Sequence, residues 1–262
     1  MEVPIYSIKG KASKKSAKLP DAFNEPVRLD LIRKAVRASR ANRRQPYGAS
    51  NRAGFRHSVS WPGKGRGMAR TPRKNGGGGR GAQAPNTIGG RRAHPPKAEK
   101  DWTLKINSKE NKKAFKSALA ATSQESYVLA RGHQIPEKAT LPYVVEDKIE
   151  TLAKDNEGGS LTKRATSLLE DLGLLGDVER ARKGKGIRAG KGKSRGRKYR
   201  TPKSVLLVLS EDSDSERAFR NLSGVDVTTS KNLNTELLAP GGDPGRLVIF
   251  SKSAVSALGE RL

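Results

Sequence analysis

The sequence predicts an α/β fold: a three-layer domain with a mainly parallel central sheet, interrupted by a long extended basic loop. Continuous apolar runs, of which 204–209 is the clearest, alternate with amphipathic helical segments. This is the pattern of a parallel sheet that is covered on both faces. The 58 residues 41–98 instead have a loop composition, with 12 glycines and 6 prolines. We therefore expect residues 1–40 and 99–262 to form a single α/β globular domain.

A strand and a helix precede the loop. Residues 3–8 read as a short strand. Asn24 and Pro26 are typical of a helix start, as cap and first-turn residue, and we expect this helix to run to about Arg40. Its apolar stripe consists of Val27, Leu31, Ala35 and Ala38.

The remaining elements follow the loop. We expect Ser108 to cap the first of these helices and Gly173 to end the third. The helices are expected at 108–121, 145–152, 161–172 and 214–222, and from Ser251 onward. The strands are expected at 127–130, 141–145, 204–209, 225–228 and 246–250.

Positive charge is concentrated in two segments. The chain holds 53 basic and 26 acidic residues, a net charge of +27. Residues 41–98 carry 13 basic residues and no acidic one, and residues 180–203 carry 12 basic residues and no acidic one. The other 180 residues hold 28 basic and 26 acidic groups, so they are nearly neutral. Because blocks of like charge repel one another, both segments indicate a polyanionic partner.

The residue types within these segments favour RNA. Residues 41–98 contain 10 Arg against 3 Lys, and Arg suits both bidentate phosphate contacts and stacking. Tyr47, Phe55 and Trp61 lie among these arginines, where stacking on unpaired bases is the better interpretation than a packed core. The candidate RNA-binding residues of the loop 41–98 are Arg43, Arg44, Tyr47, Arg52, Arg56, Trp61, Lys64, Arg66, Arg70, Arg73, Lys74, Arg80, Arg91, Arg92 and His94. Those of the second basic segment, 180–203, are Arg188, Lys191, Lys193, Arg195, Arg197, Lys198 and Arg200.

Other functional classes lack their signatures. There is no Cys and only three scattered His, so we expect no metal site, no thiol chemistry and no cofactor. The Gly-Lys-Gly triplets lack the spacing of a nucleotide-binding loop. The acidic run 211–216 reads as a helix-capping loop, and no acid/base cluster indicates an enzyme. The longest apolar run is five residues and the N-terminus lacks a signal peptide, so we expect no membrane partner.

Two alternatives stay open from residues alone. A DNA-compacting architectural protein would also be basic, although the sequence shows no recognition helix, zinc finger or leucine zipper. An RNA-processing factor could use an α/β scaffold, but it would need a catalytic cluster.

Several segments resemble a known family. They are RRQPYG at 43–48 with SWPGKGRGMARTPR at 60–73, GGRRAHPP at 89–96, IRAGKGKSRGRKYR at 187–200 and LAPGGDPGRL at 238–247. In order and spacing they resemble the family of the universal large-subunit ribosomal protein number four. The basic motifs are similar to its archaeal and eukaryotic branch, and the lack of a long C-terminal extension favours the archaeal side.

The resemblance implies a structural constituent of the large ribosomal subunit, which is not an enzyme and acts in the cytoplasm within the ribosome. It implies binding to large-subunit ribosomal RNA, support of early assembly, and a loop that lines part of the nascent-peptide exit tunnel. The tip would be about 61–73, with Trp61, Lys64 and Arg66 lining the tunnel. The implied partners are ribosomal RNA, neighbouring large-subunit proteins including one that faces the loop across the tunnel, and the nascent peptide in passing.

Overall fold

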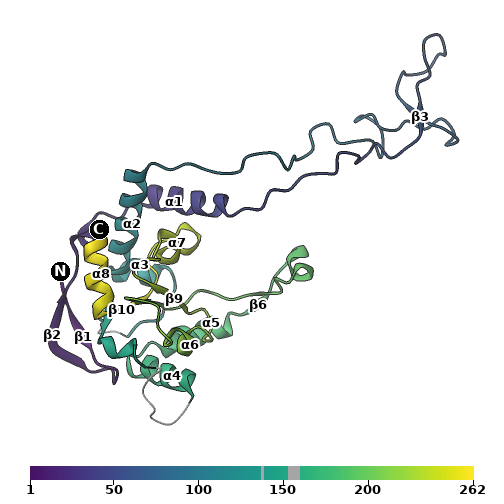
Figure 1. The fold of residues 1–262 in the computed structure, drawn as a ribbon. Coiled ribbons are helices and arrows are strands. Elements are labelled where there is room, and N and C mark those ends of the chain that lie inside the picture. Colours follow the sequence, from purple (N-terminus) through teal and green to yellow (C-terminus); the bar gives the residue numbers. More distant parts are fainter. Residues whose placement is uncertain (137–138, 153–159) are drawn as a thin grey trace. The chain divides into compact units, whose positions relative to one another are not determined.

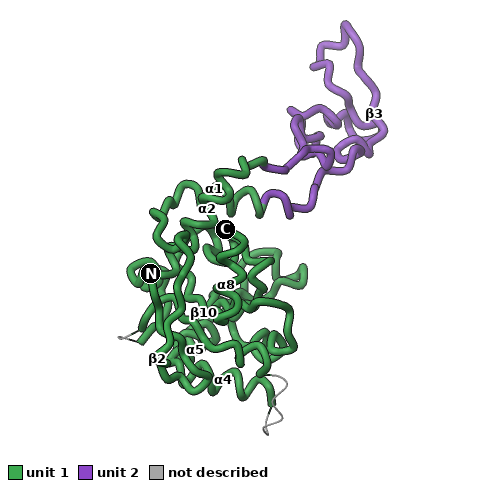
Figure 2. Tube along the Cα trace, turned by 60° about the vertical axis from the view of Figure 1, so that its left-hand side comes forward, with its two compact units in different colours: residues 1–40, 105–262 green, residues 41–104 purple. Residues whose placement is uncertain are grey.

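The computed structural model describes residues 1–136, 139–152 and 160–262. Their contacts divide the chain into two compact units, shown in separate colours in Figure 2. We call residues 1–40 and 105–262 the body, and residues 41–104 the loop unit.

The body is built on one six-stranded sheet in the order β2–β1–β5–β10–β8–β9. Figure 1 labels β1, β2, β9 and β10 of this sheet. Five of these strands run parallel, and β2 alone pairs antiparallel, with its neighbour β1. The strands are β1 (Glu2–Tyr6), β2 (Ala12–Lys18), β5 (Tyr143–Val145), β8 (Leu206–Leu209), β9 (Asp226–Thr229) and β10 (Val248–Ser251). The predicted α/β class with a mainly parallel sheet is therefore confirmed.

Helices surround the sheet. Ser160, Asn234 and Ser251 each cap a helix, because their side-chain oxygens accept a backbone N–H from three residues later. The α-helices are α1 (Leu29–Asn42), α2 (Ser108–Thr122), α3 (Glu125–Ala130), α4 (Leu161–Asp171), α5 (Leu175–Lys183), α6 (Glu216–Phe219), α7 (Thr235–Leu238) and α8 (Lys252–Arg261). The 3₁₀ helices are η1 (Asp21–Asn24), η2 (Asp147–Ile149), η3 (Gly190–Arg195) and η4 (Pro240–Gly242).

Alternate residues of the central strands face two separate cores. Leu206 and Val208 of β8 pack with Ile32 of α1 and with residues of α2 and α8. Leu207 and Leu209 pack on the other face, with residues of α4, α5 and α6. Both faces are covered, which is why β8 is apolar at every position and every one of its residues is buried.

Some expected elements are wrong. Residues 127–130 were expected as a strand but belong to α3, because a short apolar run does not distinguish a strand from a helix. Only Val128 of that run is buried, while Leu129 faces solvent. The expected helix 145–152 is the end of β5 followed by η2. Asn24 ends η1 instead of capping α1, which begins at Leu29.

Strand β2 was not expected at all. Its sequence, ASKKSAK, buries only Ala17 and exposes its three lysines. It is an edge strand, and lysines on an edge strand protect its unpaired side from further pairing. Charge on such a strand hides the apolar alternation by which strands are recognised.

A buried arginine, Arg246, links the sheet to the end of the second basic segment by a hydrogen bond and an ion pair. Arg246 is fully buried, and its Nε donates to the carbonyl of Ser204 at 3.0 Å. Its Nη2 lies 2.6 Å from the carboxylate of Asp226, which is also 2.8 Å from Nζ of Lys203. Burial alone would raise the pKa of Asp226, but the charges of Arg246 and Lys203 outweigh it and lower the pKa.

We predict that Asp226→Asn destabilises the body by about 2–3 kcal/mol at pH 7, because it leaves the buried Arg246 without its counter-charge. A carboxyl whose folded-state pKa is lowered stabilises the fold above its unfolded pKa of about 3.9 and loses that effect as pH falls through the folded value. The difference between wild type and variant should therefore shrink below about pH 4. Urea unfolding followed by circular dichroism measures it.

The matched control is Asp30→Asn, which removes an exposed pairing with Arg28 and should cost little at either pH. An equal loss in both variants, or a difference that does not change with pH, would contradict the predicted role of Asp226.

Candidate nucleic-acid interface

The loop unit presents its cations to solvent. Of the 15 candidate residues between 41 and 98, only Arg73, Lys74 and Arg91 are half-buried, and the others are exposed. No carboxylate lies between Leu31 and Ala98 in the sequence. The exposed side chains of this set are therefore within reach of an anionic partner.

An aromatic stack holds together the two ends of the loop unit. The rings of Tyr47 and Trp102 stack with centroids 5.7 Å apart and planes 15° apart. The guanidinium of Arg44 lies 4.1 Å from the Trp102 ring centroid, and Nζ of Lys100 lies 4.6 Å from it. The two arms also bond directly, because the Ala49 N–H donates to the Pro96 carbonyl at 2.9 Å. We call these contacts the neck of the loop unit.

Backbone hydrogen bonds order the middle of the loop unit, a region in which the sequence predicted no sheet. Strands β3 (Val59–Ser60) and β4 (Arg73–Lys74) form a short antiparallel hairpin. The Ala82 N–H donates to the Pro72 carbonyl at 2.8 Å, and Ala82 is buried. The side chain of Gln83 donates to the carbonyl of His57 at 2.8 Å. Two-residue strands are too short to leave an alternation in the sequence, so this hairpin could not be predicted.

The segment between β3 and β4 exposes both backbone and cations. Trp61, Lys64 and Arg66 are all exposed, and Trp61 retains 69% of its accessible surface. Gly63, Gly65 and Gly67 alternate with these cations at φ values of 73°, 78° and 65°. A Cβ at any of these glycines would meet nothing within 4 Å, so the backbone conformation, and not lack of space, requires glycine.

The second basic segment begins in the last turn of α5 and continues as a hairpin of the body. Strands β6 (Gly186–Ile187) and β7 (Tyr199–Arg200) pair antiparallel, and η3 lies between them. Arg188 braces the turn, because its Nε donates to the Arg197 carbonyl at 3.2 Å. All seven candidate residues of the segment, Arg188, Lys191, Lys193, Arg195, Arg197, Lys198 and Arg200, are exposed.

Sequence reasoning missed two aromatic residues of these surfaces. Trp102 lies beyond Glu99, the first acidic residue after the loop, and so fell outside the segment defined by charge. Tyr199 is half exposed, with Nζ of Lys185 4.8 Å from its ring centroid. The sequence carries a signal for both residues, because each aromatic residue adjoins or nearly adjoins a lysine. An aromatic ring beside a cation is typical of a surface that binds single-stranded nucleic acid.

The acidic run 211–216 does not cap a helix through its side chains. Ser215 precedes α6 without accepting a side-chain cap bond, and the Glu216 N–H bonds instead to the Ser213 carbonyl. Within residues 1–136, 139–152 and 160–262, no three His, Cys, Asp or Glu side chains gather as they would around a metal ion. In the same ranges, none of the helices has both the length and the apolar character needed to span a bilayer.

We predict that Trp102→Leu opens the neck without unfolding the body. Removing the stack and its cation–π contacts should speed hydrogen exchange of the Ala49 N–H about tenfold, since each such contact contributes about 0.5–1.5 kcal/mol. Amide exchange in β8 should not change. NMR-detected exchange of the full chain measures both.

Trp61→Leu is the matched control, because Trp61 is exposed and belongs to no aromatic pair among the described residues. Unchanged exchange at Ala49 in Trp102→Leu, or equal acceleration in both variants, would show that the stack does not hold the neck.

Comparison with known proteins places the chain in a family. The model of the ribosomal protein L4/L1 family matches residues 17–261. The large ribosomal subunit protein uL4 of Halobacterium salinarum is 48% identical over 243 residues, 93% of either chain. That of Methanopyrus kandleri is 46% identical over 266 residues, covering 100% of this chain and 99% of its own. That of Methanococcoides burtonii is 49% identical over 244 residues, 93% of this chain and 92% of its own. The family expected from the basic motifs is therefore confirmed, and this chain belongs to the ribosomal protein L4/L1 family.

Proposed function

We propose that this chain is a structural constituent of the large ribosomal subunit that binds ribosomal RNA through its loop unit and its second basic segment. The observation that carries the proposal is the set of 25 basic residues in two acid-free segments, most of them exposed. The names of the relatives, each a large ribosomal subunit protein, support the same role.

The mechanism follows from electrostatics. Each arginine or lysine that neutralises a phosphate releases condensed counterions, and this release drives binding without reading sequence. The exposed guanidinium groups add bidentate phosphate contacts and stacking. Glycines at 63, 65 and 67 leave the backbone bare beside the cations, so it can approach a folded RNA chain closely. Such a protein holds RNA segments together and needs no catalytic group.

The finer roles concern the loop. In our proposal the protein joins the subunit early in assembly, as its family membership implies, and RNA neutralises the exposed cations of its two basic segments. The tip of the loop lines the exit tunnel, with Trp61, Lys64 and Arg66 toward the nascent peptide. The chain also contacts neighbouring large-subunit proteins in the cytoplasmic ribosome, including one that faces the loop across the tunnel. The exposed side chains of these three residues support the tunnel assignment.

We predict a steep salt dependence of RNA binding. If about ten phosphates are contacted, log K should fall with log salt at a slope near −7 to −9. Filter binding of the full chain to large-subunit ribosomal RNA, from low to moderate salt, measures the slope. A slope shallower than about −3 would contradict the proposed binding mode.

Duplex DNA of equal length is the competitor that separates the alternatives. A ribosomal protein should prefer the folded RNA, whereas equal affinity for both would favour a DNA-compacting protein.

We predict that the tip is dispensable for folding. Replacing residues 61–72 by Asn-Gly joins the paired residues Ser60 and Arg73 through a two-residue turn. The circular dichroism of the body should not change, and most RNA affinity should remain, because only Lys64, Arg66 and Arg70 are lost from the basic set. Loss of the body's fold would contradict the assignment of the tip.

The tunnel role has its own readout. A photoreactive residue at Lys64, in assembled ribosomes carrying a stalled chain, should cross-link to the nascent peptide. The same probe at Ile88, which is also exposed, serves as the control. Equal cross-linking from both positions, or none from Lys64, would remove the tunnel assignment.

A further inference from the structure

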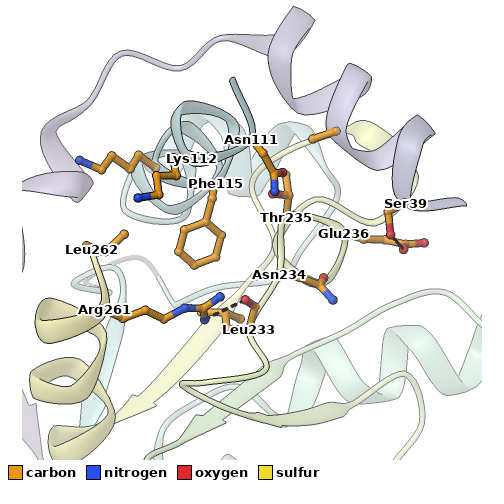
Figure 3. Close-up of a pocket in the computed structure, with 12 residues that line it drawn as sticks. Ser39, Asn111, Lys112, Phe115, Leu233, Asn234, Thr235, Glu236, Arg261 and Leu262 are labelled. Atoms are coloured by element: carbon orange, nitrogen blue, oxygen red, sulfur yellow. Dashed lines mark hydrogen bonds between the residues drawn. The ribbon is translucent and has the colours of Figure 1, made fainter. Parts of the chain in front are cut away.

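A pocket of the body lies outside both basic segments. Its volume is about 310 Å³, and it lies between α1, α2, the start of α7 and the end of α8 (Figure 3). This is the lower end of the range for sites that hold a small molecule or a single recognised group. None of its lining residues belongs to the proposed RNA-binding set.

One wall of the pocket can stack against a flat group. The ring of Phe115 points into the pocket, with Arg261 beside it (Figure 3). The Arg261 guanidinium lies 5.2 Å from the ring centroid and is fixed, because its Nη1 donates to the carbonyls of Ser230 at 2.6 Å and Leu233 at 3.0 Å. An aromatic ring with a fixed guanidinium is the surface on which unpaired bases stack.

The rim of the pocket is positively charged. Lys112 and Lys116 lie one helical turn apart on α2, and neither forms an ion pair with a carboxylate of the described residues. The one acidic side chain of the lining, Glu236, is already engaged. Its carboxylate lies 3.8 Å from Nε of Arg40 and accepts from the Ser39 hydroxyl at 3.1 Å. The α-carboxylate of Leu262 also lines the pocket, but neither lysine forms an ion pair with it or with Glu236 among the described residues. Both lysines can therefore bind an anion from outside.

Polar groups also line the pocket. The Asn111 amide, which can both donate and accept, lies next to Thr235 at the mouth (Figure 3). A base needs donors and acceptors along its edge, and a phosphate chain needs cations beside the stacked ring. Helix α2 supplies both the groups for a base edge and the cations for a phosphate. Its spacing places four residues on one side of the helix: Asn111, Lys112, Phe115 and Lys116.

We propose that this pocket binds one unpaired nucleotide of RNA. The base stacks on Phe115, Asn111 bonds to its edge, and Lys112 and Lys116 hold the adjoining phosphates. The inference rests on the proposed function for the identity of the ligand as RNA. The pocket adds a base-recognising site on the body to the phosphate-binding segments. Binding of one base there fixes the position of the body along its RNA.

A matched pair of variants tests the charges. Lys112→Ala with Lys116→Ala removes the two pocket lysines. Lys109→Ala with Lys113→Ala removes two exposed lysines of the same helix that do not line the pocket. In filter binding of the full chain to large-subunit ribosomal RNA, the first pair should lower the salt slope by about 2, roughly one unit for each phosphate contact, and the second pair by clearly less. Equal effects would overturn the proposal.

The stacked base has a separate test. Phe115→Leu keeps apolar volume against the core but removes the aromatic face, so it should lower RNA affinity about tenfold with no change of salt slope. Chemical probing should show one base that is protected by the wild type and exposed with the variant. Unchanged affinity and unchanged protection would overturn the proposal even though RNA binding itself persists.

Cross-linking decides between RNA and a protein ligand. A photoreactive residue at Asn111 in assembled large subunits should link to RNA. A link to a protein would overturn the proposal and assign the pocket to an acidic peptide. Failure of the proposed function would look different, because the wild type itself would then bind ribosomal RNA weakly and with a shallow salt slope.

Discussion

Repulsion among uncompensated positive charges is the constraint on which the rest of this structure depends. Arg180 pairs with Asp177 and Lys203 with Asp226, but most of the 25 cations of the two acid-free segments have no carboxylate partner among the described residues. They are instead shaped locally. The neck uses an aromatic stack, the middle of the loop unit uses backbone bonds, and the β6–β7 hairpin is braced by Arg188. Each device keeps a cationic segment ordered while its charges stay exposed.

The body supplies the rigidity that the basic segments lack. Its sheet is covered on both faces, and two apolar clusters hold the helices against it. Arg246 extends that rigidity to the end of the second basic segment, because the same guanidinium binds the Ser204 carbonyl and the Asp226 carboxylate. A buried guanidinium is costly without such partners, so the sheet and the hairpin base depend on each other.

Elements that show in the composition of a whole segment could be predicted from the sequence. Elements that depend on a few contacts could not. The buried strand predicted at 204–209 is β8 at 206–209, and it was found because 205–209 are all apolar. The two basic segments were found because charge is counted directly from the sequence. Strand β2 was missed because lysines mask its alternation, and α3 was wrong because four apolar residues fit either structure. The pocket around Phe115 could not be predicted, since its walls come from elements far apart in the chain.

Sedimentation of native cell extract on sucrose gradients, in moderate and in high salt and probed for this protein, tests the central claim most directly. If the cationic segments are buried in folded RNA, many phosphate contacts act together and the protein should stay with the large subunit in high salt. Release at modest salt, or a peak at the top of the gradient, would contradict an integral ribosomal role and indicate a peripheral nucleic-acid-binding protein.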